Sequence, residues 1–375
     1  MGANMTDPGV HPDSGAAFVP VERATDPVVR VHDLAMIEFA GPDTDRAWKF
    51  FSDFGLTGSR DGDGNLQFSA EAGAPVCLVY RPAKKAEFIG PTFAVRSREE
   101  LDALHRQAGA TAPAPLPLPG APTGVILGDP NGVAVKVAIF EDWRSLPDCG
   151  PPEAINRGCE RPRVNTPVRP QRQPSRVLRL GHMVLGTPEW ESTARFYIDT
   201  FGLIPSDVQS LPDGRPAIAF MRCDRGDDPA DHHTFVVGRL PILDFEHAAF
   251  EVPDLDDVGM GAEVLKEEGF RRAWGIGRHI LGSQIFDYWF GPDGRKFEHF
   301  ADGDLFNASR PTRSHAMSAA GLAAWAPPVP GAFLRPRLGW HEFRQLLGNL
   351  FGGSSFGFKE LKLLGSAMRS SSTPD

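Results

Sequence analysis

The sequence predicts an α+β protein made of two tandem modules and a C-terminal helical extension. Its 375 residues, 41% of them hydrophobic, are enough to bury more than one module. A pattern of short apolar strands and amphipathic helices begins near residue 29 and begins again near residue 176, which indicates an internal duplication. We therefore expect modules over 29–143 and 176–305, a linker rich in Pro and Arg over 144–175, and an extension over 306–375.

The first module opens with a predicted strand over 34–39, a Gly-Pro-Asp turn and a helix over 43–54 whose aromatic residues recur at helical spacing. Further strands are expected over 66–68, 76–80 and 92–95, and a helix over 97–107 that Ser97 and Glu100 could cap reciprocally. A turn over 129–132 leads into a closing strand over 133–140. Residues 1–28, rich in Gly, Pro, Asp and Ala, are expected to be a disordered tail.

The second module repeats this order. A strand is predicted over 182–185, a turn over 187–189, a helix over 190–201 ending at Gly202, and a closing turn and strand over 291–298. In the alignment of the two copies, Met36 corresponds to His182 and Lys136 corresponds to Glu298. Because a lysine is a poor ligand and repels a cation, only the second copy can carry a metal and the first is expected to be scaffold.

The extension contains a proline-rich connector over 325–330 and two amphipathic stretches, over 341–351 and 358–368. Their apolar spacing predicts helices laid on a surface, which either cover the mouth of a site or make a subunit contact. The last seven residues are expected to be disordered.

Composition excludes several classes of function. The formal net charge is −9 and no basic block interleaves with aromatic residues, which argues against nucleic-acid binding and favours a small-molecule ligand. The four cysteines are scattered without a CxxC pair, which indicates a reducing compartment. No apolar run approaches the roughly 18 residues of a membrane helix. We expect a cytoplasmic protein that does not bind membranes and that forms a homo-oligomer.

Three residues of the second copy form a candidate metal site. His182 and His247 lie in predicted strands of alternating pattern, and Glu298 lies between two phenylalanines in a third. Taken singly, each is more simply a structural residue. Taken together, two imidazoles and one carboxylate are the ligand set of mononuclear non-haem iron(II) oxygenases, which leaves adjacent metal positions open for substrate and dioxygen.

These residues occur within longer motifs, namely Gly181-His182, Asp231-His232-His233-Thr234-Phe235, Glu246-His247-Ala248, and Gly277-Arg278-His279 through Tyr288, Pro292, Gly294 and Glu298. In these motifs the second copy resembles the catalytic half of the type I extradiol catechol dioxygenases of the vicinal oxygen chelate superfamily, such as the 2,3-dihydroxybiphenyl dioxygenases. The resemblance implies tandem vicinal-oxygen-chelate modules, each a pair of βαβββ units whose curved sheet forms an open cup.

The resemblance also implies roles. His182, His247 and Glu298 would be the ligands of Fe(II), for which Mn(II) could substitute. His233 matches the acid/base histidine of the family, and His279 and Tyr288 match its substrate-contacting and proton-transfer positions. A catechol must lose a proton to chelate the metal, and a nearby base or phenol can accept that proton.

The chain departs from the family pattern at four positions, which bear on substrate identity and proton routing: Leu281, Gly282, Asp287 and Gly291. His232 is expected to be structural and to point away from His233 if both lie in a strand, and His299 is expected to face away from the metal. The remaining histidines receive no role: His11, His32, His105, His315 and His341.

We expect an enzyme that inserts both atoms of dioxygen into a catecholic substrate beside its vicinal hydroxyls. Two alternatives stay open. One is a glyoxalase-like or epimerase-like isomerase or lyase that uses the metal as a Lewis acid; such sites usually draw ligands from both halves of a paired module and include a second carboxylate. The other is a non-catalytic small-molecule-binding protein, in which the triad would be expected to erode.

Overall fold

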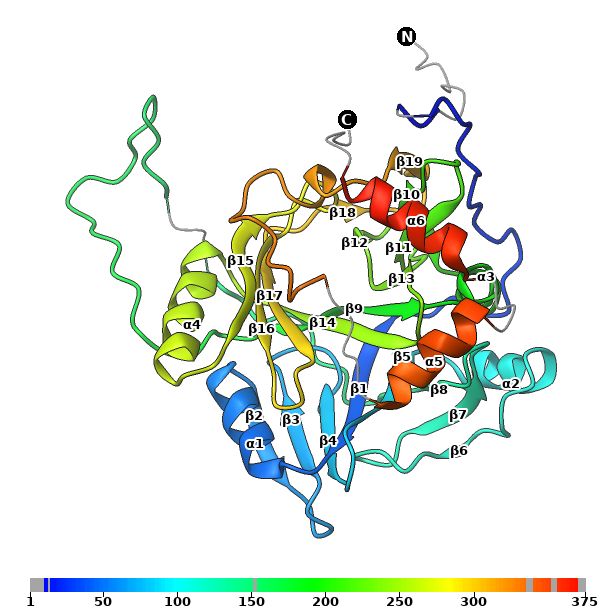
Figure 1. Ribbon diagram of the computed structural model, residues 1–375. Helices are drawn as coiled ribbons and strands as arrows, with labels where there is room; N and C mark the ends of the chain where they lie inside the picture. The colour runs from blue at the N-terminus through cyan, green and yellow to red at the C-terminus, as the bar shows by residue number, and fades with distance from the viewer. Residues whose placement is uncertain (1–9, 13, 151–153, 335–339, 352–355, 370–375) are drawn as a thin grey trace.

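Two curved β-sheets, one from each predicted module, form the body of the computed structural model (Figure 1). The structure describes residues 10–12, 14–150, 154–334, 340–351 and 356–369. The predicted α+β class with tandem modules and a helical C-terminal extension is confirmed. Over the described ranges, none of the helices combines the length and the apolar character needed to cross a membrane.

The first sheet consists of two consecutive βαβββ units. The first unit contains β1 (Asp33–Gly41), α1 (Thr44–Asp53), β2 (Thr57–Arg60), β3 (Leu66–Ser69) and β4 (Leu78–Pro82). The second contains β5 (Glu87–Ala94), α2 (Arg98–Gln107), β6 (Ala114–Pro115), β7 (Thr123–Gly128) and β8 (Ala134–Ala138). The strand order is β2-β3-β4-β1-β5-β8-β7-β6, so antiparallel pairing of β1 with β5 joins the units.

The second sheet repeats this plan. Its first unit contains β9 (Arg179–Thr187), α3 (Trp190–Phe201), β10 (Ile204–Ser210), β11 (Pro216–Arg222) and β13 (Phe235–Arg239). Its second unit contains β14 (Asp244–Glu251), α4 (Leu255–Glu267), β15 (Arg272–Arg278), β16 (Ile285–Phe290) and β17 (Lys296–Ala301). The strand order is β15-β16-β17-β14-β9-β13-β11-β10-β19, in which the edge strand β19 (Arg313–Ala316) comes from the C-terminal extension. A separate ribbon pairs β12 (Ala230–Asp231) with β18 (Leu305–Phe306).

Local signals in the sequence fix the helix boundaries. The Asp43 carboxylate accepts the backbone N–H of Arg46 at the start of α1. Ser97 and Glu100 form the predicted capping box at the start of α2. Helix α3 ends at Gly202, whose φ of 69° lies in the left-handed region that favours glycine. These caps hold each crossover helix to the length that its unit requires.

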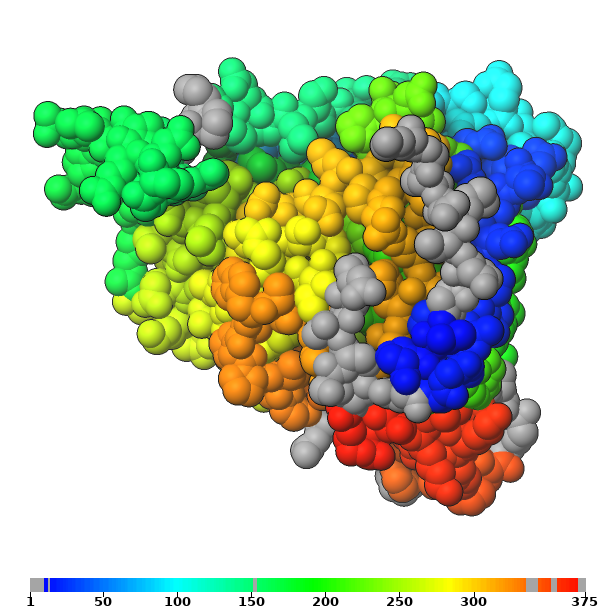
Figure 2. Space-filling model, turned by 90° about the horizontal axis from the view of Figure 1, so that it is seen from above, coloured from blue at the N-terminus to red at the C-terminus, as the bar shows by residue number. Residues whose placement is uncertain are grey.

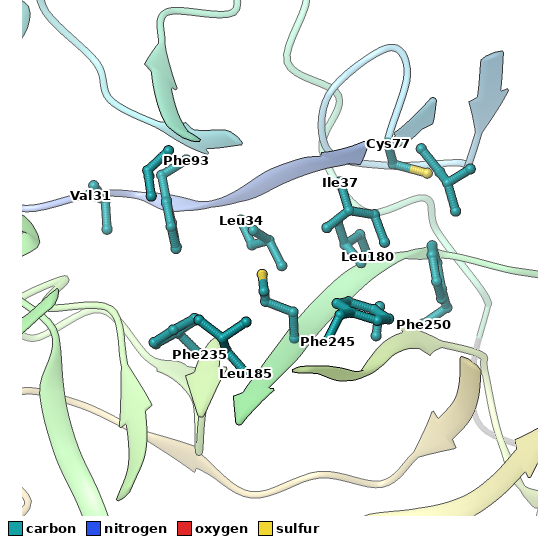
Figure 3. Close-up of a cluster of buried hydrophobic side chains, with 14 of the residues drawn as sticks. Val31, Leu34, Ile37, Cys77, Phe93, Leu180, Leu185, Phe235, Phe245 and Phe250 are labelled. Atoms are coloured by element: carbon teal, nitrogen blue, oxygen red, sulfur yellow. The ribbon is translucent and has the colours of Figure 1, made fainter. Parts of the chain in front are cut away.

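One hydrophobic core joins the two sheets. Figure 3 shows Leu34, Ile37 and Phe93 of the first module facing side chains of the second, and Leu180, Leu185, Phe235, Phe245 and Phe250 belong to the same buried cluster. Strands alternate their side chains between two faces, so the face of β9 that carries Leu185 lies opposite the face that carries His182. The core therefore occupies the backs of the sheets and leaves the hollow side of the second sheet for a site.

The N-terminal segment differs from the expected disordered tail. Phe18 and Val21 are buried, and the N–H of Val19 donates to the carbonyl of Gly214 at 2.9 Å. Two further backbone hydrogen bonds tie Val28 and Val29 to the end of α3. Composition failed here because a few apolar side chains and backbone hydrogen bonds to the second module are enough to order the segment. Residues 1–9, part of the same prediction, lie outside the described residues.

The predicted linker is irregular, whereas the extension contains a strand and helices. In 144–150 and 154–175 the structure has no helix and no sheet strand, and Figure 1 shows this segment looping away from the body. The extension contributes β19 (Arg313–Ala316), the 3₁₀ turn η1 (Ala320–Leu322), α5 (Trp340–Phe351) and α6 (Phe358–Ala367). Figure 2 shows its orange and red atoms against the second module. The expected disorder of the last seven residues falls almost wholly on 370–375, outside the described residues.

The position equivalent to Glu298 holds a buried ion pair in the first module. Lys136, the third residue of β8, donates from Nζ to the carboxylate of Glu38, which is only 1% exposed. Arg81 donates to the other oxygen of Glu38 at 2.8 Å. The first cup therefore neutralises its buried carboxylate with the side-chain cations of Lys136 and Arg81.

Substituting Lys136→Met should lower the free energy of unfolding by about 3 kcal/mol, because it leaves the Glu38 carboxylate buried with only one cation. Urea denaturation of the variant and the wild type measures this difference. The double variant Glu38→Gln/Lys136→Met should recover most of the loss, since it removes both charges together. Equal stability of Lys136→Met and the wild type would contradict the prediction.

Candidate metal centre

Three strands of the second sheet bring the predicted ligands together on its hollow side. The Nε2 atoms of His182 (β9) and His247 (β14) lie 3.4 Å apart. The Oε2 atom of Glu298 (β17) lies 3.4 Å from Nε2 of His182 and 3.3 Å from Nε2 of His247. Metal bonds to imidazole nitrogen and carboxylate oxygen are about 2.0–2.2 Å long, so one ion can reach all three atoms.

Glu298 is a buried carboxylate, and such a group is stable in its charged form only beside a cation or hydrogen-bond donors. Its side chain is 0% exposed, and neither carboxylate oxygen has a hydrogen-bonding partner among the described residues. Burial raises the pKa of this carboxyl, but its interactions with His182 and His247 outweigh that effect and hold the pKa well below the ordinary value. Burial lowers the pKa of His182 and favours its neutral, ligating form. The donor set therefore fits a divalent cation.

A second carboxylate orients His247. Glu246 accepts a hydrogen bond from Nδ1 of His247 and pairs with the ammonium of Lys296. An Nδ1–H held in this way leaves Nε2 as the atom free to bind a metal. The sequence contained a signal for this role, a carboxylate directly before the ligand, but its orientation depends on an irregularity in β14 between Phe245 and His247.

His279 and Tyr288 lie beside the triad and contact one another. The Nδ1 atom of His279 lies 2.7 Å from the carbonyl of Leu322, and its Nε2 atom lies 2.9 Å from the hydroxyl of Tyr288. Because a carbonyl can only accept, Nδ1 carries the proton, and in neutral His279 the Nε2 atom accepts the proton of Tyr288. Burial raises the pKa of Tyr288 well above its ordinary value. The phenol is therefore protonated, and its oxygen retains lone pairs for a ligand.

A buried chain of hydrogen bonds supports His233. Its Nδ1 atom lies 2.8 Å from Nδ1 of His232, and Nε2 of His232 lies 2.6 Å from Asp207. The other oxygen of Asp207 lies 2.7 Å from Nε2 of His315 in the extension. Burial raises the pKa of Asp207, but hydrogen bonds from the two imidazoles bring it down to about 2, so the carboxylate is ionised.

Hydrogen-bond roles along this chain assign the tautomer of His233. Ionised Asp207 accepts from Nε2–H of His232, so Nδ1 of neutral His232 has a lone pair. Nδ1–H of His233 must then be the donor between the two rings, which leaves a lone pair on Nε2. Burial is the main cause that holds the pKa of His233 well below its ordinary value, and the neighbouring histidines lower this pKa further.

His232 and His315 differ from the sequence expectations. His232 was expected on the opposite face from His233, but both residues lie between β12 and β13 rather than in one strand, and their rings share a hydrogen bond. His315, for which no role was predicted, completes the chain because β19 pairs with β10. His299 faces away from the triad as predicted, since its Nε2 lies 2.7 Å from the carbonyl of Phe54.

Steric contacts account for two departures from the family pattern. Gly282 has a φ of 83°, and a Cβ there would lie 3.1 Å from the ring of His232. A Cβ on Gly291 would lie 2.6 Å from the ring of Phe297. The third departure, Asp287, is buried and paired with Arg272 at 3.0 Å, and burial raises its pKa to about 7. Leu281, the fourth, lines the cavity described next.

A cavity of about 260 Å³ begins at the triad and follows the hollow side of the sheet. Five of the site residues predicted from the sequence line this cavity: His182, His233, His247, His279 and Tyr288. Apolar side chains from β9, β11 and β13 and from the extension form much of the remainder. The arrangement places three residues that could hold a metal ion, with imidazole and phenol groups beside them, at one end of an apolar chamber.

Comparison with known proteins identifies similar chains. Residues 179–299 match the family model of the Glyoxalase/Bleomycin resistance protein/Dioxygenase superfamily. The chain is 33% identical over 217 residues to Metapyrocatechase 2 of Cupriavidus necator, a match that covers 58% of this chain and 64% of that protein. It is 30% identical over 138 residues to an iron-dependent extradiol dioxygenase of Rhodococcus jostii (strain RHA1), covering 32% of this chain and 44% of that protein.

Among solved structures, the Mn(II)-bound glyoxalase from Novosphingobium aromaticivorans is similar, with a TM-score of 0.67 and 22% identity over 88% of this chain and 99% of that one. At this identity the likeness establishes a shared fold. The chain spans less than two thirds of the length of the two curated relatives it matches.

Proposed function

We infer that this protein, whose residues 179–299 belong to the Glyoxalase/Bleomycin resistance protein/Dioxygenase superfamily, is an extradiol ring-cleaving dioxygenase acting on a catecholic substrate. The observation that carries this proposal is the cluster of His182, His247 and Glu298 with His233 and Tyr288 beside it. A matched relative is named a metapyrocatechase and another an iron-dependent extradiol dioxygenase, which supports the same reaction class.

We assign iron(II) to the triad, with manganese(II) as a possible substitute because it takes similar ligands. When bound, the metal would supply redox-active Lewis-acid chemistry toward the catechol and dioxygen. His182, His247 and Glu298 would hold the ion. Glu246 keeps the Nε2 atom of His247 directed at it.

Tyr288 and His279 are assigned to the substrate hydroxyls. The phenol of Tyr288 donates its proton to His279, so its oxygen can accept a hydrogen bond from a catechol hydroxyl. That contact orients the ring and helps the hydroxyl to release its proton on chelation. The carbonyl of Leu322 holds the His279 ring in place.

His233 is assigned as the acid/base residue. The chain from Asp207 through His232 leaves Nε2 of His233 unprotonated, so this atom can take up a proton from the substrate and later return one. Its low pKa favours return of the proton. The apolar lining excludes water, which strengthens these polar contacts.

Anaerobic reconstitution with iron(II) tests the proposal. The protein should bind one iron per chain, take up one dioxygen per catechol and form a yellow ring-fission product, whereas the His247→Ala variant should do none of these. His105→Ala serves as the matched control, because His105 lies on α2 in the first module and should be dispensable. Iron binding without oxygen uptake on a panel of catechols would contradict the dioxygenase and favour a metal-dependent isomerase.

Substituting Asp207→Asn should lower kcat about 10- to 100-fold without loss of iron. An asparagine can donate to His232 through its amide, which reverses the hydrogen-bond roles along the chain and places a proton on Nε2 of His233. Steady-state kinetics together with iron content measure the effect. His315→Ala should have a smaller effect, since the carboxylate still accepts from His232; an unchanged kcat in Asp207→Asn would contradict the assigned tautomer.

A further inference from the structure

We propose that the C-terminal extension forms the distal wall of the substrate chamber, and that Leu364, Met368 and Met317 select catechols carrying a neutral, apolar substituent about the size of a second ring. The inference rests on the proposed function for the identity of the reacting ring. It concerns the C-terminal extension, for which two roles were predicted from the sequence: covering the mouth of a site or making a subunit contact.

The extension is built into the site rather than resting on its surface. Strand β19 adds to the edge of the second sheet beside β10. Further on, backbone carbonyls of the extension accept hydrogen bonds from three side chains that line the chamber. Leu322 accepts from His279 at 2.7 Å, Pro327 from Trp274 at 2.9 Å, and Phe333 from Lys296 at 2.9 Å.

Helix α6 closes the end of the chamber far along the sheet from the triad. Leu364 and Met368 line the cavity and pack with Leu211, Ala217 and Met317 in one apolar cluster. An ion pair at 3.0 Å between Arg215 and Glu360 fixes the start of the helix against the turn after β10. The helix therefore presents a defined apolar surface to the chamber.

The size of the chamber exceeds what one ring needs. A cavity of about 150 Å³ accepts benzene, whereas this cavity measures about 260 Å³. Its floor between the histidines and α6 carries apolar side chains from three strands, namely Val184, Ile218, Phe220 and Val236. A substituent directed from the catechol along this floor would reach Leu364 and Met368.

Charge pairing in the lining argues for a neutral substituent. Arg239 pairs with Glu191 at 2.5 Å, Lys296 with Glu246, and Arg295 with Asp293 at 3.2 Å. A substrate carboxylate that paired with Lys296 or Arg295 would take that cation from the largely buried carboxylate of Glu246 or Asp293. The Gln209 amide, 1% exposed and with no hydrogen-bonding partner for its Oε1 among the described residues, is a neutral polar group in the lining.

The test compares three substrates in the iron-loaded, full-length protein: catechol, 2,3-dihydroxybiphenyl and 3,4-dihydroxyphenylacetate. Wild-type protein should prefer 2,3-dihydroxybiphenyl. In Leu364→Ala, KM for that substrate should rise about 10-fold or more with little change in kcat, because apolar contact is lost far from the reacting atoms. The ratio of kcat/KM for 2,3-dihydroxybiphenyl to kcat/KM for unsubstituted catechol should therefore fall about 10-fold.

Leu361→Ala is the matched control, since Leu361 lies on the same helix, is 43% exposed and does not line the chamber. The inference is overturned if wild-type protein prefers 3,4-dihydroxyphenylacetate, or if Leu364→Ala and Leu361→Ala behave alike on 2,3-dihydroxybiphenyl. Anaerobic titration calorimetry with 2,3-dihydroxybiphenyl separates this inference from the proposed function. If binding weakens only in Leu364→Ala and no variant turns over, the role of the extension is supported and the proposed dioxygenase activity is overturned. If wild-type protein does not bind 2,3-dihydroxybiphenyl, the role of the extension is overturned.

Discussion

Glu298→Gln is expected to abolish iron(II) binding and ring cleavage while the protein stays folded. Glutamine keeps the volume of the side chain but removes the charge that the buried triad offers to the metal. At a free metal concentration of 1,000 times Kd, the wild type should gain about 4 kcal/mol of stability. The variant should gain none. Thermal denaturation with and without iron(II) under anaerobic conditions, together with iron content after desalting, measures both effects.

Two comparisons make the Glu298 result specific. Glu263→Gln, on the solvent side of α4 with half of its side chain exposed, should bind iron as the wild type does. Glu246→Gln should bind iron about 10- to 100-fold more weakly, because it loses the group that orients His247 but no ligand. Iron binding of wild-type strength in Glu298→Gln would remove this residue from the proposed ligand set.

Repetition in the sequence made the two modules predictable. Alternating patterns located β1 and β9 at equivalent places, and aligned turns located β8 and β17. The differences at Met36 and Lys136 could then be interpreted, and in the structure Lys136 pairs with the buried Glu38. Pairing of β14 with β9 and β17 brings His182, His247 and Glu298 into one cluster, which no single strand pattern could establish.

Contacts made by irregular segments were not predictable. The extension reaches the site through backbone carbonyls, such as that of Leu322 on His279, and a carbonyl group has no signal in the sequence. His315 received no role because its link to Asp207 depends on β19 adding to the edge of the sheet. The orientation of His232 was predicted only for the case that it shares a strand with His233, and the segment that holds both is not a strand.

His233→Gln is expected to retain iron but to lower kcat by about 10²- to 10⁴-fold, the range contributed by a positioned acid/base group. Glutamine suits this test because its amide N–H can still donate to Nδ1 of His232, so the chain through Asp207 keeps its partners. Single-turnover kinetics under anaerobic loading, followed by mixing with oxygen, measure the chemical step apart from substrate binding.

A merely structural histidine would give a different pattern, because its replacement would lower stability or iron content together with activity. His232→Gln provides that comparison, since His232 contacts Asp207 but does not line the cavity. We expect His233→Gln to slow the chemical step more than His232→Gln does, with the Kd for the catechol little changed in both. If the two variants lost activity equally, the proton would have to be moved by another group at the site, for which the pair of Tyr288 and His279 is the nearest arrangement.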